Sequence, residues 1–159
     1  MVLSGTGSDA ELFFEDIPVG HVFDLGTIAV DRDEMLAFAR RFDPQWYHVE
    51  EAQAKASQYG DIIASGFFTA ALFMRAYADS VLSRAAANAS PGLEELRWLA
   101  PVYGGDLLSG RLEVLGAAPS QARPGYGTLH LQATLTRING DGRDVMRTTF
   151  RGWFALRPT

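Results

Sequence analysis

The sequence predicts a single α+β domain in which a mostly antiparallel sheet covers one buried helix. From Gly66 to about Leu82, apolar side chains surround the helix axis on nearly every side, which is typical of a buried helix. After a break at residues 88–92, the chain continues as four strand-like segments in series, at Leu93–Val102, Leu107–Ala117, Tyr126–Asn139 and Val145–Leu156. The length of 159 residues, 47% of them hydrophobic, suits one domain with a substantial core.

The residues ahead of the apolar helix predict, in order, a strand, a helix and a short helix: Val22–Val30 with Gly26 at a bulge, Asp31 to Asp43, and Glu50–Ser57. Asp31 followed by Glu34 is close to a capping box, so the first helix is expected to begin there. Pro44 disfavours helical geometry in the residue before it, so the same helix is expected to end at Asp43.

Two of the later strands show a clear alternation. Leu129, Leu131, Ala133 and Leu135 oppose His130, Gln132, Thr134 and Thr136, while Met146, Phe150, Phe154 and Leu156 oppose Arg147, Thr149 and Arg151. Asn139-Gly140-Asp141-Gly142 between them is a strong hairpin signal. Each of these strands therefore has one apolar face for the helix.

Composition excludes several classes of function. There is no cysteine, so disulfides, thiolate nucleophiles and cysteine-based metal sites are excluded, and the three histidines show no ligand spacing for a metal. The net charge of −5 argues against broad nucleic-acid binding. No apolar run is long enough to span a membrane, and residues 1–10 have no secretory signal and are expected to be a flexible leader. A cytoplasmic protein is the default expectation.

One stretch has the character of a site. Asp43 and His48 lie five residues apart around a proline, and the small-residue turn at Ser65-Gly66 then opens the apolar helix. If the loop and the helix N-terminus converge, two proton-transfer groups face unpaired backbone N–H donors, which is the minimum equipment for chemistry beside a carbonyl. Ser65 is expected to cap the helix, because a serine nucleophile needs an adjacent histidine base and no such signature is visible.

Several segments together resemble the MaoC-like dehydratase family, the (R)-specific enoyl-CoA hydratases of the hotdog fold. They are Phe14-Glu15-Asp16-Ile17-Pro18-Val19-Gly20, Phe42-Asp43-Pro44-Gln45 with His48, Ile62-Ile63-Ala64-Ser65-Gly66, Leu96-Arg97-Trp98 with Pro101-Val102, and Ser120 to Gly125. The resemblance implies one hotdog domain at residues 11–159, with a long central helix wrapped by a curved, mostly antiparallel five-stranded sheet. It also implies a homodimer or higher even oligomer, and an acyl-CoA or acyl-carrier-protein thioester as substrate. No metal or organic cofactor is expected.

Carried over position by position, the resemblance implies that Asp43 and His48 activate water and that the Gly66 backbone N–H binds the thioester carbonyl. Adding water to a double bond conjugated with a thioester requires a base, a proton for the α-carbon and donors for the enolate oxygen. The chain departs from many relatives after Gln45, after Gly66 and at Met74, so the pocket is expected to differ more than the reaction. The expected substrate-binding residues are Ser65, Trp46, Tyr47, Phe67, Met74, Arg97 and Arg123.

Other interpretations stay open at this point. Asp43 can simply cap a turn while His48 packs beside Trp46, and Gly66 can be a close-packing glycine. A hotdog acyl-CoA thioesterase is the second hypothesis, although such an enzyme usually needs a carboxylate on or near the central helix, and residues 66–78 contain none. A non-catalytic acyl-binding subunit is the third, although it would be expected to lose the aspartate and the histidine.

Overall fold

The computed structural model describes residues 11–159, and the leader expected at residues 1–10 lies outside the described part. The elements in chain order are η1 (Phe14–Asp16), β1 (Val22–Ala29), α1 (Arg32–Phe42), α2 (Trp46–Val49), α3 (Glu51–Lys55), α4 (Gly66–Ser80), η2 (Leu82–Arg84), β2 (Leu93–Trp98), β3 (Leu107–Pro119), β4 (Tyr126–Arg137) and β5 (Asp144–Ala155). Among residues 11–159, no helix combines the length and the apolar character that crossing a bilayer requires.

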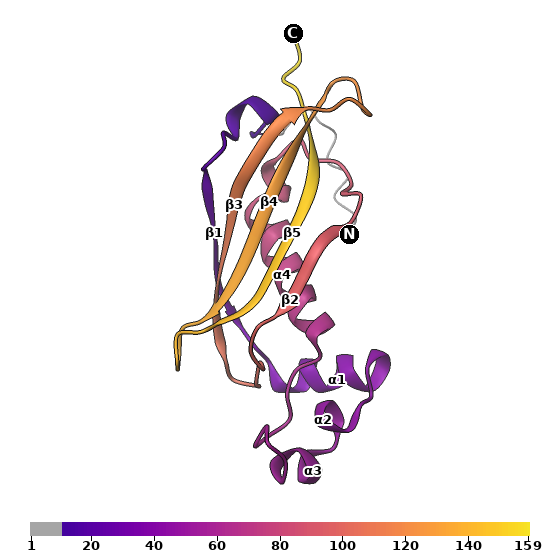
Figure 1. The fold of residues 1–159 in the computed structure, drawn as a ribbon, viewed down its shortest axis with the longest axis vertical. Helices are drawn as coiled ribbons and strands as arrows, with labels where there is room; N and C mark the ends of the chain where they lie inside the picture. Colours follow the sequence, from indigo (N-terminus) through magenta and orange to yellow (C-terminus); the bar gives the residue numbers. More distant parts are fainter. Residues whose placement is uncertain (1–10) are drawn as a thin grey trace.

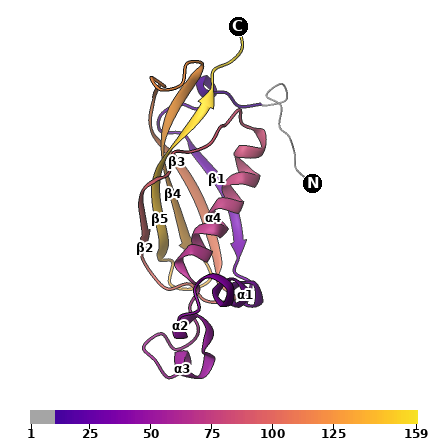
Figure 2. The same ribbon diagram turned by 90° about the vertical axis from the view of Figure 1, so that its right-hand side faces the viewer.

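The five strands form one antiparallel sheet in the order β1-β3-β4-β5-β2. α4 runs along one face of this sheet, and α1, α2 and α3 gather at the end where α4 begins (Figures 1 and 2). The prediction of an α+β fold with a five-stranded sheet around one helix is therefore confirmed. The bulge predicted in the first strand is confirmed too, because the β1–β3 register shifts between Asp24 and Gly26, where Gly26 has a φ of 79°.

The apolar core lies between α4 and the sheet. On β4, the side chains of Leu129, Leu131, Ala133 and Leu135 are all fully buried, as their alternation predicted. On α4, Phe73 and Tyr77 both meet Phe150 of β5 edge-on, with ring centroids 5.8 and 5.6 Å apart. Burial of these large rings fixes α4 across the middle of the sheet and sets where its N-terminus lies.

The prediction that α4 is buried on every side is wrong for one face of the single chain. The residues that face the sheet are buried, whereas Phe67 and Met74 are 62% and 47% exposed. On the neighbouring edge strand β2, Leu93 and Trp98 are 54% and 47% exposed. These four residues form an exposed apolar strip between α4 and β2, which we call the open seam. The apolar side chains on this face of α4 are therefore not covered within one chain.

The predicted end of the strand that begins at Leu93 is also wrong. The strand expected at Leu93–Val102 ends at Trp98, because Pro101 has no N–H for the ladder and the chain leaves the sheet. The loop that follows is held by Arg137, which donates to the carbonyl oxygen of Pro101 and lies 3.0 Å from the Asp106 carboxylate.

The short helix expected at Glu50–Ser57 is confirmed as α3 (Glu51–Lys55), but the sequence did not predict the separate helix α2 (Trp46–Val49) before it. Glu50 between them is extended, with φ and ψ of −100° and 90°, so neither helix continues through it. His48 thus lies on a helical turn, where the sequence predicted a loop.

Candidate active site

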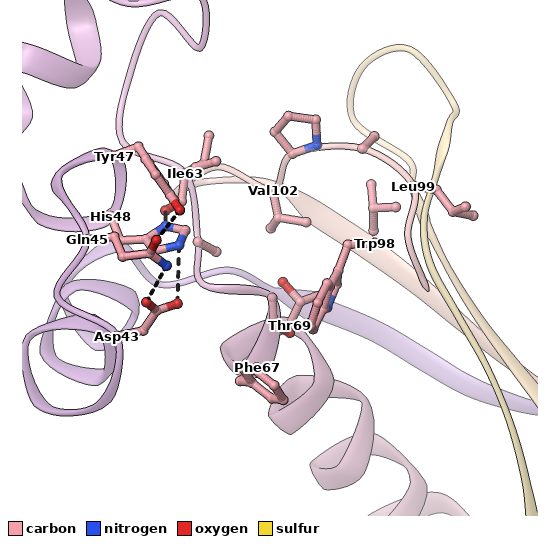
Figure 3. Close-up of a pocket in the computed structure, with 15 residues that line it drawn as sticks. Asp43, Gln45, Tyr47, His48, Ile63, Phe67, Thr69, Trp98, Leu99 and Val102 are labelled. Carbon is pink, nitrogen blue, oxygen red and sulfur yellow. Dashed lines mark hydrogen bonds and ion pairs between the residues drawn. The ribbon is translucent and has the colours of Figure 1, made fainter. Parts of the chain in front are cut away.

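A cavity of about 440 Å³ opens at the N-terminus of α4. Figure 3 shows Asp43, Gln45, Tyr47 and His48 on one side of it and Trp98 and Leu99 on the other, with the first turn of α4 between them. Three segments that are far apart in the sequence build it: the chain around α2, residues 63–69, and residues 98–102. The sequence prediction that the loop and the helix N-terminus converge is confirmed.

Asp43 terminates α1, where its backbone N–H donates to the Ala39 carbonyl at 2.8 Å. Two neutral side chains donate to its carboxylate: the Gln45 amide to Oδ1 at 2.7 Å and the Ser65 hydroxyl to Oδ2 at 2.8 Å. Burial raises the pKa of Asp43, but the hydrogen bonds from Gln45 and Ser65, together with the proximity of His48, outweigh burial and leave that pKa below its ordinary value. Asp43 is therefore a carboxylate at neutral pH.

His48 is held by the first turn of α2 and is 5% exposed. Its Nδ1 lies 2.7 Å from the Ile63 carbonyl oxygen, which only accepts hydrogen bonds, so the ring proton of the neutral imidazole is on Nδ1. Nε2 is then an acceptor that faces Asp43 Oδ2 at 3.3 Å. The two acceptor atoms are close enough for one water to donate a hydrogen to each of them.

Gly66 is the first residue of α4, so its backbone N–H has no acceptor within the helix and lies at the positive end of the helix dipole. The Trp98 indole packs directly on this residue and donates from Nε1 to the Gly66 carbonyl at 2.8 Å. A Cβ at position 66 would lie 2.2 Å from the indole ring, so a side chain there requires the indole or the first turn of α4 to move. Glycine at position 66 therefore has two physical reasons: it leaves room for the Trp98 indole, and it lets a ligand approach the backbone N–H.

The cavity combines this polar side with an apolar wall. Ile63, Phe67 and Val102 contribute to the wall, together with Val145 from β5. The arrangement places a hydrogen-bonded carboxylate, an imidazole acceptor and a helix N-terminal N–H around one small apolar space. That combination suits proton transfer at an unsaturated carbonyl compound whose developing negative charge needs a backbone donor.

The structure brings together some of the predicted site residues and separates others. Asp43, His48, Gly66, Tyr47 and Phe67 line the cavity. Trp46 packs against Tyr47 and Tyr59, and Met74 borders a different cavity two turns further along α4.

The two arginines do not line this cavity. Arg97 is bonded to Glu95 and, by strand alternation, projects from the face opposite Trp98. Arg123 lies over the Trp153 ring in the loop between β3 and β4, at the far end of the sheet from α1–α3 (Figure 1).

The expectation that Ser65 caps α4 is confirmed for its position, since Ser65 is the N-cap residue, and wrong for its side chain. The Ser65 hydroxyl makes no cap hydrogen bond, whereas its carbonyl accepts from Phe68 and Thr69. The side chain is fully buried, and its hydroxyl points back to Asp43 and donates to that carboxylate in a charge-assisted hydrogen bond. Ser65 therefore supports the carboxylate from behind the cavity.

Sequence reasoning missed several residues of the site. The Gln45 side chain donates to the Asp43 carboxylate and accepts a hydrogen bond from the Tyr47 hydroxyl, so it connects these two residues of the cavity. Thr69 and Trp98 line the cavity as well. The position of Gln45, two residues after Asp43, could have indicated this role, because a side-chain amide at that spacing can reach back to the aspartate carboxylate. The contact of Trp98 depends on the path of β2 and had no local signal.

Comparison with known proteins places the chain among related sequences and structures. A sequence model of the MaoC like domain matches residues 16–135. A Bacillus subtilis (strain 168) protein, the uncharacterised YdeM, is 30% identical over 117 residues, which are 74% of this chain and 83% of that protein. A MaoC-like dehydratase from Rhodospirillum rubrum superposes with a TM-score of 0.83 at 36% identity, covering 93% of this chain and 99% of that one. The R-hydratase PhaJ1 from Pseudomonas aeruginosa shares the fold, with a TM-score of 0.68 at 22% identity over 92% and 91% of the two chains.

Proposed function

Since the chain belongs to the MaoC-like dehydratase family, with its hotdog fold, we propose that it adds water reversibly to a trans-2-enoyl thioester and yields the (R)-3-hydroxyacyl thioester. The observation that carries this proposal is the convergence of Asp43, His48 and the Gly66 N–H on one cavity. The carrier of the acyl group is CoA or an acyl carrier protein. Neither a metal nor an organic cofactor takes part in the proposed reaction.

In the proposed reaction, Asp43 and His48 hold one water with its oxygen toward C3 of the enoyl group. As the new O–C3 bond forms, a water proton passes to His48 Nε2 and the electrons of the double bond move into the thioester. The resulting enolate oxygen accepts a hydrogen bond from the Gly66 N–H, which the helix dipole strengthens. The proton then passes to C2, and the thioester bond stays intact. Asp43 stabilises the imidazolium that exists between these two steps.

The open seam between α4 and β2 supports a homodimer, or a larger even assembly, as the active form. β2 is an edge strand with unpaired backbone groups. It contributes the exposed Leu93 and Trp98, and α4 contributes the exposed Phe67 and Met74. A second copy joined along β2 by a two-fold axis covers both features at once, and places the partner next to the catalytic cavity. Sedimentation velocity should give an even oligomer at assay concentration. An active monomer would contradict this part of the proposal.

Because the net charge of the chain is −5, binding of a polyanionic carrier requires a local cluster of positive side chains. In a dimer related by such an axis, the two chains run in opposite directions, so the Arg123 end of one chain lies alongside the catalytic end of the other. We infer that Arg97 and Arg123 contribute to carrier binding across this joint. Rising salt should then raise KM for the thioester more than it lowers kcat, because exposed charge pairs are screened.

A screen of trans-2-enoyl-CoA thioesters of graded length and branching tests the proposed reaction. Product should be (R)-3-hydroxyacyl-CoA, and activity should survive a chelator. Release of free thiol across all lengths without any hydration would favour the thioesterase alternative.

A further inference from the structure

A second cavity, of about 220 Å³, lies between the C-terminal half of α4, β5 and the start of β2. Its wall is mostly apolar, with Asn88 and Ser90 as uncharged polar members. The residues that form most of it are Phe73, Met74, Tyr77, Leu93, Phe150 and Phe154. Complete small-molecule sites usually enclose roughly 300 to 1,000 Å³, so this cavity suits one end of a longer ligand better than a whole one.

The Tyr77 hydroxyl differs from the Asn88 and Ser90 side chains in this wall, because those two are already hydrogen-bonded within the protein. The side chain is only 5% exposed, but its oxygen is not completely enclosed: Tyr77 lines the cavity, and no side-chain hydrogen bond within residues 11–159 involves its hydroxyl. A ligand that fills the cavity removes this hydroxyl from water, so the ligand must offer an acceptor or leave the donor unpaired. Burial also raises the pKa of Tyr77, so the hydroxyl keeps its proton and remains a donor throughout the range of ordinary assays.

This cavity is aligned with the catalytic one along α4. Thr69, Phe73 and Tyr77 follow each other at four-residue spacing on the helix face toward the sheet, and all three are buried. Thr69 lines the catalytic cavity and Tyr77 lines the second one, about 12 Å further along the helix by the rise of 1.5 Å per residue. Phe73 stands between them, stacked on Tyr77 with ring centroids 5.7 Å apart.

Resting on the hydratase function proposed above, we propose that this second cavity takes the distal end of the acyl group and that Tyr77 donates a hydrogen bond to a neutral oxygen there. The acyl group is thus a chain long enough to pass Phe73, with a hydroxyl or keto oxygen near its far end. An ionised carboxylate does not fit, because the apolar wall offers it no countercharge and its desolvation is costly. The catalytic cavity sets the reaction, and the Tyr77 cavity sets which acyl chain is preferred.

The test compares two trans-2-enoyl-CoA thioesters of equal length, one with a plain alkyl end and one with a keto or hydroxyl group near the end. The wild-type protein should prefer the oxygenated chain by about tenfold or more in kcat/KM, since the plain chain leaves the Tyr77 donor unpaired. Tyr77→Phe removes only the oxygen and should bring the ratio of the two kcat/KM values close to one. Tyr59→Phe, which removes a hydroxyl outside this cavity, should leave the wild-type ratio.

Equal kcat/KM values for the two chains in the wild-type protein, or a preference that persists in Tyr77→Phe, would overturn the role of Tyr77 while leaving the hydratase function standing. Absence of hydration with every thioester, including short plain ones, would overturn the hydratase function and this inference with it.

Discussion

Replacing Gly66 with alanine perturbs the candidate oxyanion donor through one contact. The backbone at Gly66 is not in the left-handed region, so alanine is acceptable there by conformation. The new methyl group, however, would lie 2.2 Å from one indole carbon of Trp98 and 2.5 Å from two further ring atoms. Either the indole or the first turn of α4 has to move, and both border the cavity.

The structure sets the expected sizes. Overpacking of this kind costs about 1 to 3 kcal/mol of stability, partly offset by the ~0.5 to 1 kcal/mol that alanine gains over glycine in a helix. The protein should therefore stay folded. Displacing an oxyanion donor costs about 10²- to 10³-fold in kcat, so the loss of turnover should far exceed any loss of stability.

The assay is a double-mutant cycle of hydration kcat with Gly66→Ala, Trp98→Ala and the double variant, accompanied by urea unfolding of each protein. If the clash is the cause, alanine at position 66 should cost much less turnover in the Trp98→Ala background than in the wild-type background. Equal costs in the two backgrounds would refute the steric argument. Near-normal kcat in Gly66→Ala would refute the role of the Gly66 N–H itself.

Three further predictions concern the pair Asp43 and His48, the hydrogen bond from Ser65 to Asp43, and the ion pair between Arg137 and Asp106. Asp43→Asn and His48→Ala should each lower kcat by orders of magnitude, and the double variant should be little worse in steady-state assays, because residues that act on one water are non-additive. Ser65→Ala should raise the pKa of Asp43 in a carbon-13 NMR titration, since it removes a donor to the carboxylate. Because the pKa of Asp43 is lowered in the folded protein, the Asp43 carboxylate contributes to the free energy of unfolding above the pKa of an unfolded aspartate, and this contribution is lost as the pH falls through the folded pKa. In Ser65→Ala the folded pKa is higher, so the loss should occur at a higher pH than in the wild-type protein. Arg137→Leu should lower the free energy of unfolding by about 3 kcal/mol in urea, because it leaves the Asp106 carboxylate, 14% exposed, without its partner.

Local sequence signals were enough to predict most of the fold. Asp31 caps α1 by accepting from the Glu34 N–H, and Pro44 ends that helix at Asp43, both through contacts within a few residues. The alternation of β4 follows from the same short-range logic, since one of its faces packs on α4. Such features depend on residues that are close in the sequence, so they can be predicted without knowing the tertiary structure.

The features that were missed depend on contacts between distant segments. Ser65 has the residue type and position of a helix cap, and it turns to Asp43 only because α1 ends beside it, 22 residues away in sequence. Trp98 reaches Gly66 across 32 residues, and its role follows from the path of β2. The apolar pattern of α4 predicted burial correctly on the sheet side, while its opposite face is uncovered in one chain.

The most direct test of the account follows hydration and thiol release together, in one reaction mixture, for the wild-type protein and for Asp43→Asn. A trans-2-enoyl-CoA is the substrate, the loss of its conjugated absorbance reports hydration, and a thiol reagent reports hydrolysis. The wild-type protein should hydrate the thioester without releasing thiol, and Asp43→Asn should do neither at a comparable rate. Thiol release by the wild-type protein without hydration, or undiminished hydration by Asp43→Asn, would contradict the account.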